Sequence, residues 1–276
     1  MRIFITIFTL IFCFSTYTIA DSSSSAVLVT GSTGAFGEAI CLSLASEGYN
    51  LLITGRNEKK LKSLKNKLQT KYPSTKVETL KIDFSDFKTI KAAANKTDGV
   101  SLKAVVLIGP RPSLRKNGFP STQEWSEEFQ KTFIAPLEVV RIFGEKIENN
   151  GSIVIISGSS SKNYLPNYQN TNVLRLAWIG EVKNLVQFFA VRKIRVNAVS
   201  PGIILTEYHK KRIEEKAKLN NTTFQAQLSL DTAAIPLRSY GHTDDVANLI
   251  SFLISDKSVH LNGSNIVLDG GESTAY

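Results

Sequence analysis

The sequence predicts a single α/β domain built on a doubly wound parallel sheet of about seven strands, with helices on both faces. Three observations support this fold class. Short apolar runs alternate with helical segments from residue 26 onward, a glycine-rich turn follows the first run, and the 276 residues suit one large α/β domain. Continuous apolar strands separated by helices favour parallel strands joined by right-handed crossovers.

The expected elements follow from hydrophobic periodicity and from runs of β-branched residues. Strands are expected at 27–29, 50–54, 76–82, 102–108, 152–157, 195–198 and 265–268. Helices are expected at 38–47, 58–71, 86–96, 122–149, 168–191 and 243–255. Residues 206–237 are more polar and less periodic, and they follow a strand end, where open α/β sheets bind ligands. We interpret them as a possible lid.

The turn after the first strand carries the strongest functional signal. Gly31, Gly34 and Gly37 lie between an apolar strand and a helix. Such a turn lets the backbone approach a dinucleotide pyrophosphate, while the helix N-terminus offers unpaired N–H groups to the anion. The alternative is a loop that only turns the chain. The predicted cofactor contacts in this turn are Gly31, Ser32, Thr33, Phe36 and Gly37.

The first 20 residues differ in composition from the rest of the chain. Arg2 precedes an apolar stretch that ends at Ala20, before a serine-rich linker at 21–25. This pattern is typical of a cleaved secretory signal, and an uncleaved membrane anchor is the alternative. Either interpretation places the domain at 26–276 in the secretory pathway, in a periplasm or an endoplasmic reticulum lumen.

The net charge and the cysteine content bear on whether the chain binds nucleic acid or forms a disulfide. The net charge of +9 is densest in helix 58–71, where leucines at helical spacing separate the lysines. No aromatic residues interleave them, so we expect a solvated amphipathic face rather than a nucleic-acid surface. Of two cysteines, Cys13 lies in the leader, which leaves Cys41 without an internal disulfide partner. We predict no metal site.

Together with the glycine turn, four further segments make the chain similar to the short-chain dehydrogenase/reductase family, over residues 26 to 271. They are Thr54-Gly55-Arg56-Asn57, Ile82-Asp83-Phe84-Ser85-Asp86, Arg195-Val196-Asn197-Ala198-Val199-Ser200-Pro201-Gly202, and the stretch from Tyr240-Gly241-His242-Thr243-Asp244-Asp245 to Leu268-Asp269-Gly270-Gly271. The resemblance implies a Rossmann-type domain and a nicotinamide cofactor. It also implies a homodimer or homotetramer built through helices 122–149 and 168–191.

The residues after the second strand bear on the choice of cofactor. Arg56 stands where the adenosine ribose is expected, and no acidic residue occurs between Asn50 and Asn57. A guanidinium suits a 2′-phosphate, which favours NADP(H) over NAD(H), and a solvent-facing Arg is the alternative. The resemblance further implies cofactor contacts at Asp83, Phe84, Gly109, Arg175, Pro201, Gly202 and Thr206. Asp83 could instead cap a helix.

The four catalytic positions of the family read differently here. When the chain is aligned with the family it resembles, Thr132 falls at the family's Asn, Gly158 at its Ser, Thr171 at its Tyr and Arg175 at its Lys. A threonine hydroxyl is far too weak an acid to replace the tyrosine as proton donor. Arg175 keeps the positive charge and can still hydrogen-bond ribose hydroxyls.

An alternative relay exists on the same helix. Tyr168 lies seven residues before Arg175, which puts both within roughly 20° of one helix face, with Thr171 on that face. Ser159 is a candidate hydroxyl beside Gly158, as is Ser157. The predicted catalytic residues are therefore Tyr168, Arg175, Ser159 and Thr171. The competing interpretation is that Tyr168 only packs in the turn after Pro166.

Two functions remain open at this point. The first is an NADP(H)-dependent oxidoreductase acting on a carbonyl, alcohol or enone substrate, with a divergent proton relay. The second is a nucleotide-binding relative that has lost catalysis and serves as a binding or assembly subunit. The intact glycine turn supports cofactor binding in both cases, and the substrate is not readable from the sequence.

Overall fold

The computed structural model describes residues 25–113 and 118–275. The leader expected at 1–20 and most of the linker lie outside the described residues, so the cleaved signal remains a proposal based on composition. Within the described ranges, no helix is long and apolar enough to span a membrane.

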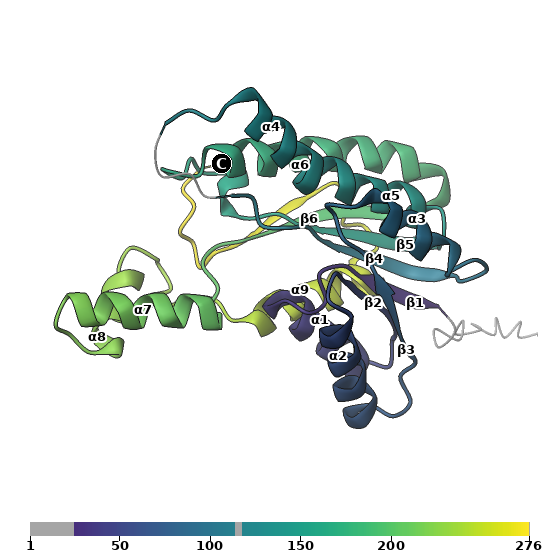
Figure 1. Cartoon of the computed structure of the whole chain (residues 1–276), viewed down its shortest axis with the longest axis horizontal. Helices are drawn as coiled ribbons and strands as arrows, with labels where there is room; N and C mark the ends of the chain where they lie inside the picture. Colours follow the sequence, from purple (N-terminus) through teal and green to yellow (C-terminus); the bar gives the residue numbers. More distant parts are fainter. Residues whose placement is uncertain (1–24, 114–117, 276) are drawn as a thin grey trace, which may run out of the picture.

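Seven parallel strands form one sheet in the order β3-β2-β1-β4-β5-β6-β7 (Figure 1). The strands are β1 Ala26–Val29, β2 Asn50–Gly55, β3 Val77–Lys81, β4 Leu102–Ile108, β5 Ile147–Ile156, β6 Arg195–Pro201 and β7 Asn265–Leu268. The doubly wound parallel sheet predicted from the sequence is confirmed. The strand order reverses between β1 and β4, and open α/β sheets bind ligands at such a switch point.

Helices cover both faces of the sheet (Figure 1). Their bounds are α1 Ala35–Ser46, α2 Glu58–Lys71, α3 Phe87–Asn95, α4 Thr122–Phe129, α5 Ala135–Gly144, α6 Gln169–Phe189, α7 Glu207–Leu219, α8 Phe224–Thr232 and α9 Thr243–Ile254. One apolar cluster packs α3, α5 and α6 on one face, and a second packs α1, α2 and α9 on the other. Within β1, Leu28 belongs to the first cluster and Val27 and Val29 to the second, because successive side chains point to opposite faces.

The prediction of a single helix at 122–149 is wrong. A π-helical segment, Gln130–Ile134, joins α4 to α5, and the chain then enters β5 at Ile147. Asn150 takes a positive φ of 66°, and a Cβ on Gly151 would lie 2.7 Å from the carbonyl oxygen of Lys103. This close approach of two strand backbones excludes a helix there, and it is a tertiary contact that periodicity does not report.

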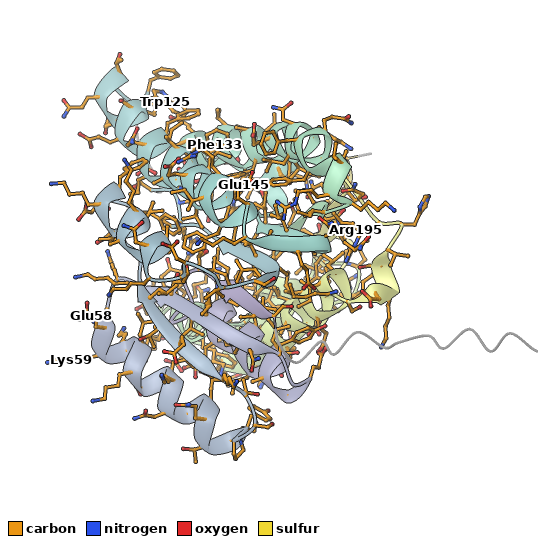
Figure 2. All side chains as sticks on the ribbon, turned by 90° about the vertical axis from the view of Figure 1, so that its right-hand side faces the viewer. Glu58, Lys59, Trp125, Phe133, Glu145 and Arg195 are labelled. Carbon is orange, nitrogen blue, oxygen red and sulfur yellow. The ribbon has the colours of Figure 1, made fainter. Side chains whose placement is uncertain are left out.

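Helix α2 has the amphipathic arrangement that its leucine spacing predicts. Leu61, Leu64 and Leu68 are buried against the sheet. The basic side chains take the opposite face, and Figure 2 shows Lys59 at the outer start of the helix. Asn57 caps this helix by accepting a hydrogen bond from the backbone N–H of Lys60.

The polar segment at 206–237 is more regular than expected. It forms α7 and α8, which pack on each other and extend away from the sheet (Figure 1). Only Ile213 and Ala217 of α7 are buried, and Ile213 forms a small apolar cluster with Ile235 and Tyr240. Because so little apolar surface is buried, the helical periodicity of this segment is weak in the sequence.

Candidate functional site

A cavity of about 440 Å³ opens at the carboxyl edge of the sheet, beside the switch point. The turn after β1, the ends of β4, β5 and β6, and helix α6 all contribute to its wall. A second cavity of about 380 Å³ lies on the other side of Gly31, Gly109 and Arg111, which line both. The two cavities together form one elongated site across the edge of the sheet.

The glycine turn separates β1 from α1 and forms the centre of this site. Gly31 has a φ of +58°, a conformation that L side chains rarely adopt. A Cβ on Gly37 would lie 2.4 Å from the carbonyl oxygen of Gly31, whereas a Cβ on Gly34 would lie an ordinary 3.4 Å from the same atom. Only two of the three glycines are therefore required by the geometry of the turn.

Ser32 contributes to the turn itself rather than to the cavity. It is fully buried, its hydroxyl donates to the carbonyl of Val29, and the same oxygen accepts from the backbone N–H of Thr54. It lines neither cavity, so the predicted cofactor contact at Ser32 is wrong as far as its side chain is concerned, because its hydroxyl is engaged by one hydrogen bond to β1 and one to β2.

The second cavity brings together four predicted cofactor residues, Thr33, Arg56, Asp83 and Phe84. Arg56 is exposed at the end of β2 and makes no hydrogen bond or ion pair with the described residues. Asp83 does not cap a helix: its carboxylate accepts from the N–H of Ser85, while Asp86 caps α3. This end of the site has the residues expected around an adenosine with a 2′-phosphate.

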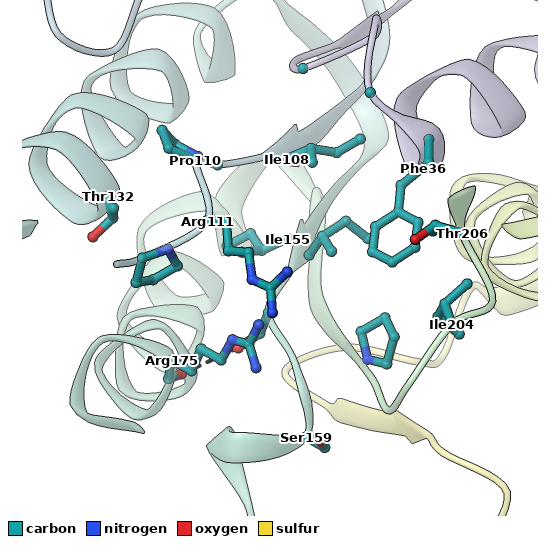
Figure 3. Close-up of a pocket in the computed structure, with 18 of the residues that line it drawn as sticks. Phe36, Ile108, Pro110, Arg111, Thr132, Ile155, Ser159, Arg175, Ile204 and Thr206 are labelled. Atoms are coloured by element: carbon teal, nitrogen blue, oxygen red, sulfur yellow. Dashed lines mark hydrogen bonds between the residues drawn. The ribbon is translucent and has the colours of Figure 1, made fainter. Parts of the chain in front are cut away.

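The first cavity contains Phe36, Gly109, Pro201, Gly202 and Thr206 of the predicted cofactor set (Figure 3). The hydroxyl of Thr206 is 3.1 Å from Nδ1 of His209, at the start of α7. A Cβ on Gly202 would lie 2.6 Å from Cβ of Asp269, so the packing of the C-terminal segment already requires glycine there.

The family's Asn and Tyr positions are occupied by threonines that play structural parts. Thr132 lies in the π-helical segment and lines the cavity, and its hydroxyl donates to the carbonyl of Glu128. Thr171 is 1% exposed, its hydroxyl has no hydrogen-bond partner within the described residues, and it lines neither cavity. Thr171 was predicted as catalytic, and its burial in α6 contradicts that assignment.

Arg175 and Gly158 fit together at the family's Lys and Ser positions. The guanidinium of Arg175 lies over Gly158, so that a Cβ there would come within 2.3 Å of its central carbon. It donates to the hydroxyl of Ser160 at 3.3 Å. Burial, and then the nearby charge of Arg111, lower the pKa of Arg175 to about 10, so it remains charged at neutral pH.

Tyr168 lines the same cavity as Arg175, but the two residues do not share a helix face as predicted. Helix α6 begins at Gln169, and Tyr168 precedes it with non-helical φ and ψ of −113° and 35°. Its proximity raises the pKa of Arg175 against the two lowering effects. Ser159 and Ser157 also line the cavity, and the Ser157 hydroxyl donates to the carbonyl of Arg175. The structure thus brings together Tyr168, Arg175 and Ser159.

Sequence reasoning missed two residues that line the first cavity, Arg111 and His209. Arg111 follows β4, and its guanidinium lies 5.3 Å from the ring centroid of Tyr208 in α7. Burial and the charges of Arg111 and Arg212 lower the pKa of His209. The available signal was the position of Arg111, two residues beyond Gly109 at the carboxyl end of a central strand.

The fold and the site define a dinucleotide-binding protein of the Rossmann type. A sequence profile described as enoyl-(acyl carrier protein) reductase matches residues 31–273. The chain belongs to the short-chain dehydrogenase/reductase family and is an oxidoreductase of that family.

Relatives with established names cover almost the whole domain. The 3-oxoacyl-[acyl-carrier-protein] reductase FabG of Rickettsia bellii is 30% identical over 91% of this chain and 98% of its own. The NADPH-dependent reductase BacG of Bacillus subtilis is 26% identical over 90% of this chain and 98% of its own. An NADPH-bound short-chain oxidoreductase of Pseudomonas aeruginosa PAO1, described as containing an atypical catalytic center, superposes with a TM-score of 0.83 at 23% identity, over 93% of this chain and 99% of its own.

The two close approaches at the glycine turn predict opposite outcomes for two alanine variants. Gly37→Ala places its Cβ 2.4 Å from a backbone oxygen and has to open the turn, whereas Gly34→Ala meets only ordinary contacts. We expect Gly37→Ala to weaken NADPH binding at least about tenfold and Gly34→Ala to change it less than about twofold. Titration of NADPH fluorescence measures both, and thermal unfolding checks the fold. Equal affinities of the two variants would contradict this account of the turn.

Proposed function

We propose that this chain is an NADPH-dependent reductase of a carbonyl or enone compound, with Tyr168 as the proton donor and Arg175 as the cation beside it. One observation carries the proposal. The elongated site joins Arg56 at one end to Tyr168 and Arg175 at the other, through the glycine turn. That arrangement matches the order adenosine, pyrophosphate and nicotinamide along a dinucleotide.

The residues of the turn fit a bound NADPH. Gly31 and Gly37 allow the tight turn between β1 and α1, and the N-terminus of α1 faces the cavity where a pyrophosphate would lie. Arg56 would hold the 2′-phosphate, and Arg175 would hold ribose hydroxyls. NADPH supplies the hydride when it is bound. BacG is named an NADPH-dependent reductase and the Pseudomonas structure is NADPH-bound, which supports this cofactor for the present chain.

Two tyrosines line the cavity, Tyr168 and Tyr208, and we choose Tyr168 as the acid because its charge acts on Arg175. A guanidinium nearby stabilises the phenolate that remains after a proton leaves. Ser159 lines the cavity and can orient a substrate oxygen. The buried hydroxyl of Thr171 cannot reach the cavity.

One feature favours the second candidate, a nucleotide-binding subunit without catalysis. All four family positions differ, and the guanidinium of Arg175 takes the space of the missing serine side chain over Gly158. Under this alternative the chain binds NADPH and reduces no carbonyl or enone.

We also propose that the chain forms a homo-oligomer through α6. Several apolar residues of the two helical segments through which an oligomer was expected are buried in the domain itself, namely Val139, Val140, Phe143, Leu174 and Trp178. Others remain exposed on α6 or beside it, namely Val173, Leu176, Phe188 and Val191. Exposed apolar residues gathered on one helix are typical of an interface between subunits.

The position of Arg56 predicts a preference for NADPH that one substitution removes. Arg56→Ala should weaken NADPH binding about 10-fold to 100-fold and leave NADH binding nearly unchanged, because a charge-assisted hydrogen bond to the 2′-phosphate is lost. Fluorescence titration of both cofactors measures this. Lys59→Ala removes the same charge from the exposed start of α2, outside both cavities, and serves as the control. Equal affinity of the wild type for both cofactors would refute the assignment.

Replacing the proposed acid should separate catalysis from cofactor binding. Tyr168→Phe removes only the hydroxyl, so turnover should fall by about 10²-fold or more while NADPH affinity stays nearly unchanged. Absorbance loss of NADPH with a panel of ketones and enones measures turnover. Tyr164→Phe, at a side chain 76% exposed outside the cavity, should behave as the wild type. Activity that survives Tyr168→Phe would reject this relay.

If the wild type binds NADPH but reduces nothing, restoration of the family residues tests the second candidate. Gly158→Ser, Thr171→Tyr and Arg175→Lys have to be combined, because the guanidinium of Arg175 occupies the space that a serine at 158 needs. Gain of activity in the triple variant would show that the scaffold binds cofactor and substrate and lacks only the relay.

The exposed apolar face of α6 predicts an oligomer that a charge can disrupt. Wild type should scatter light as a dimer or tetramer at micromolar concentration, with an interface above about 1,000 Å². Phe188→Asp, at a side chain 68% exposed, should shift it toward monomer, whereas Tyr164→Asp should not. A monomeric wild type would contradict the proposal.

A further inference from the structure

We propose that the substrate carries a carboxylate, which binds between the guanidinium groups of Arg111 and Arg175 in the first cavity. This inference rests on the proposed function, because the bound molecule is a substrate only if the protein is a reductase. The two side chains come from different elements, Arg111 from the segment after β4 and Arg175 from α6. Figure 3 shows both guanidinium groups pointing into the same space.

The surroundings provide no counter-charge for these two cations. No Asp or Glu lines the first cavity, and neither arginine forms an ion pair within the described residues. Arg175 donates to the Ser160 hydroxyl, and Arg111 stacks on the ring of Tyr208. Both partners are uncharged, so the positive charge of the pair is left uncompensated.

This excess of positive charge also lowers the pKa values of two groups that line the cavity. The charge of Arg111 lowers the pKa of Arg175 in α6 and also that of His209 in α7. Arg175 is half-buried and Arg111 is exposed, and a bound anion would offset the repulsion between these two like charges. The N–H groups of an arginine donate hydrogen bonds to both oxygens of a carboxylate, which makes a planar anion a good match for two guanidinium groups.

The rest of the lining indicates what the carboxylate is attached to. Apolar side chains surround the two arginines, among them Ile155, Leu165, Trp178 and Ile204. Tyr208 holds Arg111 through its ring, so α7 contributes directly to the position of this cation. The chemical class that fits is an apolar ketone or enone with a carboxylate near the reacting group.

A contact of Arg111 with the cofactor has to be separated from a contact with the substrate, because Arg111 lines both cavities. Binding of a carboxylate probe to the NADP⁺-saturated protein makes that separation without any turnover. The probe is 3-phenylpropionate, and its neutral match is 3-phenylpropanamide. Isothermal titration measures both ligands on the wild type and on Arg111→Gln.

We expect the acid to bind the wild type at least about tenfold more tightly than the amide, the value of a charge-assisted hydrogen bond. In Arg111→Gln this preference should fall below about twofold, with NADPH affinity nearly unchanged. Arg212→Gln is the matched control, because Arg212 also stacks on Tyr208 but does not line the cavity. It should keep the full preference for the acid.

Three results would overturn the inference. They are equal binding of acid and amide to the wild type, an equal loss of preference in Arg212→Gln, and a loss of NADPH affinity in Arg111→Gln as large as the loss of acid affinity. Failure of the proposed function is seen separately. If the protein is inactive but still binds the acid more tightly than the amide, the anion site stands and the proposed reductase function is rejected. If the protein is active but shows no preference for the acid, the reductase function stands and the anion site is rejected.

Discussion

The contact between Gly37 and the carbonyl of Gly31 fixes how α1 leaves β1, and the site is built around it. With 2.4 Å between that oxygen and any Cβ at position 37, the first turn of the helix lies directly against the end of the strand. Because β1 is the strand at which the sheet order reverses, the space beyond the turn stays open on both sides. The two cavities meet there, and Ser32 holds the turn to β2 by its two hydrogen bonds.

Gly158 and Arg175 show how a changed side chain alters space and charge together. A guanidinium is larger than an ammonium group, and here it extends over a residue that has no side chain. Its charge survives burial, since its pKa of about 10 is still well above neutrality. The cation expected beside the cofactor is therefore kept, while the hydroxyl of the family's serine is absent. Ser157 and Ser159, one on each side of Gly158, are the nearest hydroxyls in sequence that line the cavity.

Tyr208 and the arginines on its ring link the first cavity to α7 and α8. Tyr208 at the start of α7 contacts both Arg111 and Arg212, so the position of these helices and the position of a cavity cation depend on each other. Little apolar surface holds α7 to the domain, since only Ile213 and Ala217 of that helix are buried. Segments with few buried contacts are the ones that move at low energetic cost, which suits a wall of a substrate cavity.

The sequence by itself determined the parallel sheet, the glycine turn and the positions of Arg56, Asp83 and Pro201 at strand ends, because these depend on local periodicity and on the shared edge of parallel strands. It could not separate Gly34 from Gly37, show that the hydroxyl of Thr171 is buried away from the cavity, or end the helix before β5, since each depends on what packs alongside. The pairing of Arg111 with Arg175 was likewise decided only by the tertiary structure, which brings residues 64 positions apart into one cavity. Spacing along the chain carries no information about a contact between a strand end and the opposite helix.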